Sequence, residues 1–188
     1  MAKKRALPKF LTESERLALL RIPNKRYATG HRNLVMIHLM LNAGLRASEV
    51  LKLQLRDVDL NSGKLMVREG KGKKDRAVWL DEETLELLRQ WKERKPDGSF
   101  YFTTLDGKPV SDRYLRAALE RYGKKAGIDK RVHPHLLRHT FATQFFQNTR
   151  NILMTQKALG HADVSTTMIY THIVDEEMEA AMKGFRKR

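Results

Sequence analysis

The longest apolar segment of the chain runs from Leu34 to Leu45 and limits the possible folds. His38 and Asn42 interrupt this segment, and it is too short to cross a bilayer, which takes about 20 apolar residues. A helix that is apolar on all sides is a buried one. We therefore predict a buried helix from His31 to Ala43, ended by Gly44.

The hydrophobic period changes near residue 58 from a helical to an alternating one. Three short stretches, Val58–Leu60, Lys64–Arg68 and Arg76–Leu80, are predicted to be strands joined by turns. Thr12-Glu-Ser-Glu15 predicts a capping box that opens a helix closed by Arg21-Ile-Pro23, and Asp81 and Ser111 are predicted to cap helices at 82–95 and 112–125. The other patterns predict helices at residues 47–53, 134–148, 151–159, 164–169 and 175–185. The expected fold is therefore mainly α with a small three-stranded antiparallel sheet (α+β).

The balance of charged residues indicates a polyanionic partner. The chain has 188 residues, with 37 Lys and Arg against 22 Asp and Glu, which gives a net charge of +15 and a pI near 10.2. It contains no cysteine, which excludes disulfides, cysteine-ligated zinc and thiol catalysis, and fits a reducing cytoplasm. The basic start, Met1 to Arg5, is not followed by the apolar run of a signal peptide.

Several short motifs carry side chains suited to phosphate chemistry. They are Gly44-Leu-Arg-Ala-Ser-Glu49, Gly70-Lys-Gly-Lys-Lys-Asp-Arg76, His133-Pro-His-Leu-Leu-Arg-His139, Leu159-Gly-His161 and Ser165-Thr-Thr-Met-Ile-Tyr170. Arginine pairs with phosphate oxygens through two hydrogen bonds, and histidine titrates near neutral pH. In the third motif His135 and Arg138 are three residues apart, so they share one helical face. The set suggests a tyrosine nucleophile aimed at a DNA phosphodiester.

In order and context, these motifs resemble the catalytic domain of the tyrosine recombinases, also called phage-type integrases, and are most similar to the Xer-like and integron-type bacterial members. The resemblance runs from about Leu11 to the C-terminus. It implies the tyrosine recombinase catalytic-domain fold and a site-specific recombinase that cleaves and rejoins DNA through a 3′-phosphotyrosyl intermediate, without metal, ATP or another cofactor. It also implies double-stranded DNA as partner, a tetramer assembled on that DNA, and no membrane.

The resemblance assigns the catalytic roles residue by residue. Tyr170 is the expected nucleophile, and its phenol, with an ordinary pKa of about 10, needs a phosphorus made electrophilic by nearby cations. Arg46 and Arg138 are expected to clamp the non-bridging phosphate oxygens. Glu49, three residues after Arg46, is a candidate to orient it.

The resemblance assigns proton transfer and a phosphate hydrogen bond to a lysine and two histidines. Lys71 is the expected general acid for the departing 5′-oxygen, and its neighbours Lys73 and Lys74 are alternatives. His135 is expected to accept the tyrosine proton, and His161 to donate to a phosphate oxygen.

The resemblance also predicts how the chain is organised. Residues 1–10 are expected to be a basic tail or the remnant of a linker, and residues 11–188 the catalytic domain. The N-terminal DNA-binding domain that family members usually carry is expected to be absent. The last predicted helix, 175–185, either docks on a neighbouring subunit or packs on its own domain.

Other readings of the sequence remain open. A catalytically idle DNA-binding module derived from a recombinase would keep the basic charge, and a type IB topoisomerase shares the active-site chemistry. A basic structural or RNA-binding protein would not need the ordered motifs. His133, His135 and His139 cluster as metal ligands do, but no Asp or Glu completes a familiar ligand set.

Overall fold

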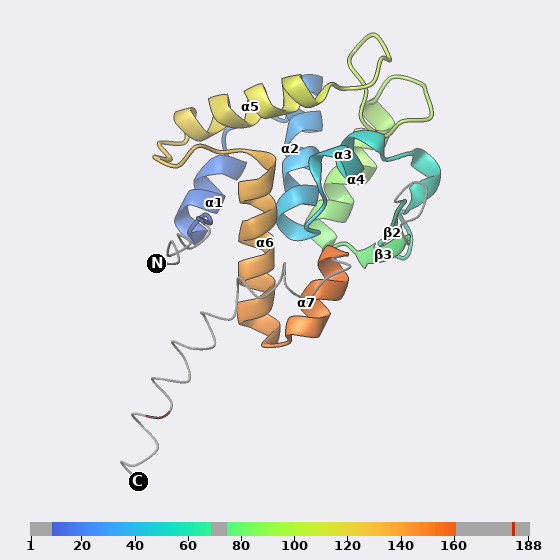
Figure 1. The fold of residues 1–188 in the computed structure, drawn as a ribbon. Coiled ribbons are helices and arrows are strands. Elements are labelled where there is room, and N and C mark those ends of the chain that lie inside the picture. The colour runs from blue at the N-terminus through green and yellow to red at the C-terminus, as the bar shows by residue number, and fades with distance from the viewer. Residues whose placement is uncertain (1–8, 69–74, 161–181, 183–188) are drawn as a thin grey trace. The chain divides into compact units, whose positions relative to one another are not determined.

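The computed structural model describes residues 9–68, 75–160 and 182 of the chain. Its helices and strands (Figure 1) are α1 (Glu13–Leu20), α2 (Ala28–Asn42), α3 (Ala47–Lys52), the 3-10 turn η1 (Leu55–Asp57), β1 (Val58–Asp59), β2 (Lys64–Val67), β3 (Arg76–Trp79), α4 (Glu82–Arg94), α5 (Asp112–Lys125), α6 (Pro134–Thr149) and α7 (Ile152–Leu159). Lys9–Phe141 form one compact unit, and Ala142–Arg188 belong to a second unit that contains the end of α6 and α7. The predicted mainly helical fold with a small antiparallel sheet is confirmed.

Helix α2 forms the centre of the first unit. Its residues from Gly30 to Leu41 are all buried, which confirms the prediction of a buried helix. It begins at Ala28 rather than at the predicted His31, because its first turn, Ala-Thr-Gly, carries none of the large apolar residues that mark a helix in sequence. Gly44 follows the helix with a φ of +64°, as expected for a residue that stops it.

Helix α4 lies beside α2 and partners the polar residues that interrupt its apolar run. The Asn42 amide donates to the Thr84 hydroxyl at 3.2 Å, and the same hydroxyl lies 3.4 Å from Nδ1 of His38. Burial lowers the pKa of His38. These two polar side chains are therefore accommodated by hydrogen bonds, as buried polar groups require.

Helix α5 passes across the N-terminal half of α2 (Figure 1) and is fastened to it by a buried polar group. The Asn33 amide donates to the hydroxyls of Tyr114 at 3.0 Å and Tyr122 at 2.8 Å. Beside it, the buried Arg32 donates to the Thr103 carbonyl at 2.7 Å and stacks on the Tyr114 ring at 5.0 Å. These directional contacts fix the crossing of the two helices.

The three strands form an antiparallel sheet in the order β1-β2-β3. Leu65 pairs with Val78, and Val67 pairs with Arg76, so these four residues share one face of the sheet. Leu65, Val67 and Val78 are buried on that face. Each strand ends one residue earlier than predicted. After β3, for example, the Leu80 amide donates to the Gly63 carbonyl outside the strand ladder.

The predicted helix boundaries are largely confirmed by their caps. Thr12 and Glu15 form the predicted capping box of α1, and the side chains of Asp81 and Ser111 accept from the first turns of α4 and α5. The helices predicted at 164–169 and 175–185 lie outside the described residues, apart from Met182. Among the residues described, no helix combines the length and apolarity that crossing a membrane requires.

Gly30 in the first turn of α2 should not tolerate a side chain. A Cβ atom there would lie 2.1 Å from the carbonyl oxygen of Asn24, in the backbone of the preceding loop. In an open helix, Gly to Ala gains about 1 kcal/mol. We expect Gly30→Ala instead to lower the free energy of unfolding by roughly 1–3 kcal/mol in denaturant titrations. Thr29→Ala is the control and should hold or raise stability; a gain for Gly30→Ala would contradict the close approach.

Candidate active site

Arg46 lies where the chain turns from α2 into α3. The turn depends on Gly44, where a Cβ would meet the Phe141 ring at 2.4 Å in addition to the positive φ. Arg46 is extended and immediately precedes the first residue of α3. Its side chain remains 31% exposed, so its guanidinium is accessible from solvent.

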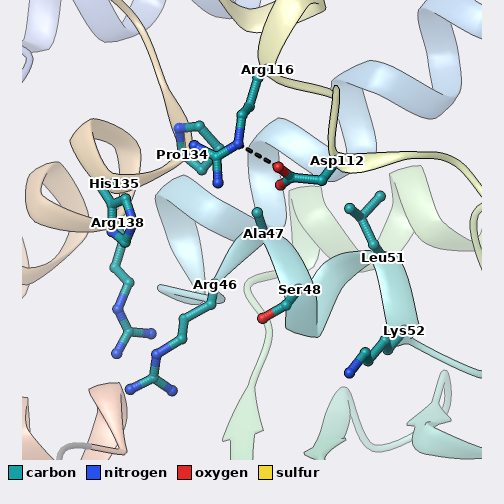
Figure 2. Close-up of a pocket in the computed structure, with 10 residues that line it drawn as sticks. All are labelled: Arg46, Ala47, Ser48, Leu51, Lys52, Asp112, Arg116, Pro134, His135 and Arg138. Carbon is teal, nitrogen blue, oxygen red and sulfur yellow. Dashed lines mark hydrogen bonds and ion pairs between the residues drawn. The ribbon is translucent and has the colours of Figure 1, made fainter. Parts of the chain in front are cut away.

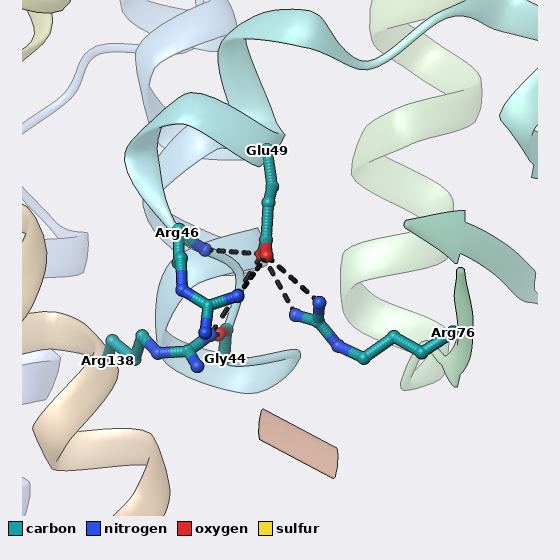
Figure 3. A network of polar contacts seen from close by, with 5 residues as sticks. All are labelled: Gly44, Arg46, Glu49, Arg76 and Arg138. Atoms are coloured by element: carbon teal, nitrogen blue, oxygen red, sulfur yellow. Dashed lines mark hydrogen bonds and ion pairs between the residues drawn. The ribbon is translucent and has the colours of Figure 1, made fainter. Parts of the chain in front are cut away.

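The Glu49 carboxylate, one turn into α3, is the centre of a polar network (Figure 3). Its Oε2 accepts from the backbone N–H of Arg46 at 2.7 Å, and its Oε1 accepts from the Arg46 guanidinium at 2.6 Å. The side chain of Glu49 is only 7% exposed. Glu49 therefore both caps the start of α3 and orients Arg46, which supports the role predicted for it.

Two further arginines reach Glu49 from other parts of the fold. Arg76, at the start of β3, donates to both carboxylate oxygens at 2.9 Å. Arg138, on α6, lies 4.0 Å from Oε2 and donates to the Gly44 carbonyl. One buried carboxylate thus joins three guanidinium groups from α3, the sheet and α6 (Figure 3).

The charge state of Glu49 follows from these contacts. Burial by itself raises the pKa of the carboxyl, but the hydrogen bonds and charge of Arg76 and the hydrogen bonds from Arg46 lower it to about 2. Glu49 is therefore ionised at neutral pH. Because three guanidinium groups face this single negative charge, the cluster keeps a net positive charge for an anionic ligand.

A pocket of about 450 Å³ opens beside this cluster (Figure 2). The guanidinium groups of Arg46 and Arg138 point in the same direction there, although they come from different helices. The lining residues come from α3, α5 and α6 and include Ser48, Lys52 and His135. Two convergent guanidinium groups match the non-bridging oxygens of a phosphodiester.

The three histidines at the start of α6 have different surroundings. Nδ1 of His133 accepts from the Leu136 amide at 3.3 Å and so caps the helix, and burial lowers its pKa. His139 is half-buried, and burial lowers its pKa too. His135 is exposed and lines the pocket. Within the described ranges no group of three or more His, Asp or Glu side chains is arranged to hold a metal ion.

The structure thus brings together three of the predicted catalytic residues, Arg46, His135 and Arg138. Lys71, His161 and Tyr170 lie outside the described residues. Sequence reasoning missed Arg76, which it assigned only to a strand after the Lys71 turn. The alternation of side chains along β3 could have identified it. Arg76 shares a face with the buried Val78, and a charged side chain on a buried face requires a partner.

Replacing Glu49 with glutamine should change how stability depends on pH. Because the pKa of the folded state is lowered, the ionised carboxylate stabilises the fold fully above about pH 4.5, and this contribution is lost as pH falls toward 2. We expect Glu49→Gln to lower the free energy of unfolding by about 3 kcal/mol at pH 7. The difference in this free energy between variant and wild type should narrow steadily toward pH 3.

Denaturant titrations at pH 7, 5 and 3 measure this gap. Glu120→Gln is the control, because Glu120 is also paired with two basic residues, Lys124 and Arg131, but at the partly exposed surface of α5. Its gap from wild type should be small at every pH. A Glu49→Gln gap that stays constant from pH 7 to 3 would mean that the ionised carboxylate is not what stabilises the cluster.

The curated relatives that this chain matches include tyrosine recombinases. The curated tyrosine recombinase XerC of Thermodesulfovibrio yellowstonii (strain ATCC 51303 / DSM 11347 / YP87) is 37% identical over 180 residues, which cover 90% of this chain. The chain spans 60% of the length of that relative.

Solved structures agree with the sequence comparison. The crystal structure of XerA recombinase aligns with a TM-score of 0.83 and 33% identity, covering 97% of this chain and 67% of that one. XerH site-specific recombinase, in a post-cleavage complex with palindromic difH substrate, aligns with a TM-score of 0.80 and 32% identity. The alignment covers 94% of this chain and 53% of that one. The phage integrase family profile matches residues 9–177. With the paired arginines and their fold in place, the chain belongs to the phage integrase family.

Proposed function

We propose that the chain is the catalytic part of a tyrosine-type site-specific DNA recombinase. The observation that carries the proposal is the pair of guanidinium groups, Arg46 and Arg138, that converge on one pocket and are held by one buried carboxylate. Family membership and the likeness to XerC, XerA and XerH support it.

The arginine pair suits phosphoryl transfer because its charge is in place before the reaction starts. In the transition state, negative charge grows on the non-bridging oxygens of the phosphorane. Donors fixed in advance stabilise that charge without reorganising, and one such donor is typically worth about 2.7–4 kcal/mol. Arg138 is suited to this role because its side chain is 9% exposed and tied to the Gly44 carbonyl.

The remaining chemistry is assigned by the order of the motifs. The Tyr170 oxygen attacks the phosphorus, the bond from phosphorus to the 5′-oxygen breaks, and a 3′-phosphotyrosyl ester forms. The phenol proton passes to His135, which lines the pocket, and the 5′-oxygen takes a proton from Lys71. His161 donates to a phosphate oxygen. Because the ester conserves the energy of the broken bond, attack by a 5′-hydroxyl rejoins the strand without ATP or metal.

Double-stranded DNA is the proposed partner. A net charge of +15 favours a polyanion, and XerH has been seen in complex with its difH substrate. We place the protein on nucleoid DNA in the cytoplasm, where subunits assemble into a tetramer that joins two DNA duplexes. A recombinase exchanges strands between such duplexes, whereas a topoisomerase only relaxes one.

The first test is covalent capture. Nicked duplexes with randomised sequence let the short cleaved fragment that carries the new 5′-hydroxyl diffuse away. The phosphotyrosyl adduct on the other fragment is then trapped, and a denaturing gel separates it. We expect the wild-type chain to form an adduct in EDTA, and Tyr170→Phe, which lacks only the hydroxyl, to form none.

The outcomes separate the alternatives. An adduct that persists in Tyr170→Phe or disappears with EDTA would overturn the proposed mechanism. Binding with no adduct from any sequence would favour the catalytically idle module. An adduct together with relaxation of supercoiled plasmid, but no exchange of strands between duplexes, would favour a topoisomerase.

The second test separates catalysis from binding. Arg46→Ala and Arg138→Ala should each slow single-turnover adduct formation about 10²- to 10³-fold, while the Kd for DNA rises less than about tenfold. Arg89→Ala, on α4, removes the same charge from a surface ion pair and should leave the cleavage rate within about threefold. Intact cleavage with collapsed binding would make Arg46 and Arg138 ordinary phosphate contacts.

A further inference from the structure

Arg76 differs from the other two arginines of the cluster in how it meets Glu49. Its Nη1 and Nη2 atoms donate to Oε1 and Oε2 respectively, both at 2.9 Å, in the parallel geometry that guanidinium forms with a carboxylate. Arg46 and Arg138 each approach with a single guanidinium nitrogen in the contacts described, at 2.6 Å and 4.0 Å. Arg76 therefore sets the plane in which the carboxylate lies.

That plane decides where the other two arginines sit. Oε1 also accepts from the Arg46 guanidinium, and Oε2 also accepts from the Arg46 backbone and faces Arg138 (Figure 3). Rotation of the carboxylate would break these contacts together. Arg76 lies on β3, so its ion pair with Glu49 connects the start of α3 to the sheet, in addition to the approach of Arg138 from α6.

Arg76 also changes how strongly Glu49 holds its partners. A buried carboxylate with only Arg46 and Arg138 nearby would pair closely with both and compete with a phosphate for them. With Arg76 present, three guanidinium groups share the single negative charge of Glu49, so the four side chains together carry a net charge of +2. This surplus attracts an anionic ligand to the pocket even though Arg46 also donates to Glu49 at 2.6 Å.

The position of Arg76 argues against direct contact with that ligand. Arg46 and Arg138 are among the residues that line the pocket, and Arg76 is not.

We propose that Arg76 is a positioning residue: it orients and balances the Glu49 carboxylate, so that Arg46 and Arg138 keep one spacing and stay available to a phosphodiester. This inference rests on the proposed function for its catalytic consequence. Its structural consequence, the binding of a phosphate group by the arginine pair, is measurable without catalysis.

The first measurement uses inorganic phosphate as the probe. In the ¹⁵N-labelled wild-type chain, the Nε–H signals of Arg46 and Arg138 should shift together as phosphate is added. In Arg76→Ala the apparent Kd for phosphate should rise at least about fivefold. Arg76→Lys retains the charge, but its ammonium group satisfies only one carboxylate oxygen at a time. Its Kd for phosphate should therefore lie between those of the wild type and Arg76→Ala. Unchanged signals and Kd in both variants would overturn the proposal.

The second measurement is a double-mutant cycle with Glu49→Gln, read as the single-turnover rate of adduct formation. Arg76→Ala alone should slow cleavage roughly 10- to 100-fold, as is typical when a residue that orients a ligand group is removed. In the Glu49→Gln background the same change should cost less than about threefold, because both residues act through one carboxylate. Independent, additive losses would show that Arg76 acts on DNA directly.

The pH profile gives a readout that general loss of structure would not reproduce. The charged groups described around Glu49 are Arg46, Arg76 and Arg138, and removing Arg76 raises the pKa of the carboxyl. The acid limb of the cleavage profile should therefore move to higher pH in Arg76→Ala. In Arg76→Lys the acid limb should lie close to its wild-type pH. An unmoved limb would contradict the proposed role.

Arg68→Ala is the matched control. Arg68 directly follows β2 and pairs with Asp57 rather than with Glu49, so its loss removes the same charge near the same sheet. It should combine additively with Glu49→Gln and leave the acid limb in place. If the wild-type chain forms no adduct but Arg76→Ala still weakens phosphate binding, the proposed function fails and the role of Arg76 stands.

Discussion

The site depends on one buried carboxylate that three arginines share. Without Glu49, the guanidinium groups of Arg46, Arg76 and Arg138 would repel one another in a region that is mostly shielded from water. With it, they are held within reach of one another and retain a net positive charge. The same carboxylate caps α3, so the helix start and the anion site form together. Local helix stability and the proposed phosphate binding therefore have a common origin in this residue.

The rest of the first unit serves to bring these side chains together. The buried helix α2 ends at Gly44, whose positive φ and contact with Phe141 set the path of the chain into Arg46. The Gly44 carbonyl in turn accepts from Arg138 on α6. The sheet contributes Arg76 because its inner face, with Leu65 and Val78, packs toward the core. The arginine pair that lines the pocket is thereby built from segments that are distant in the sequence.

Local patterns were sufficient to predict most of the secondary structure. Capping side chains such as Thr12 and Asp81 act within one turn of their own helix, so they are visible in the sequence. The start of α2 was misplaced because Ala28 to Gly30 carry no apolar period. Part of the site was also predictable: Arg46, His135 and Arg138 stand in short motifs, and all three line the pocket. Lys71, His161 and Tyr170 remain predictions of the motif order.

The sequence alone indicates the chemistry, because the chain is very basic and its arginines, histidines, lysine and tyrosine follow the order of a recombinase site. Which charged groups share a partner is visible only in the folded molecule. The alternation along β3 indicates that Arg76 needs a partner, but its two bonds to Glu49 exist only because the fold brings Arg76 within side-chain reach of α3. Pairing between buried charges is set by long-range packing, and no local pattern in a single sequence encodes it.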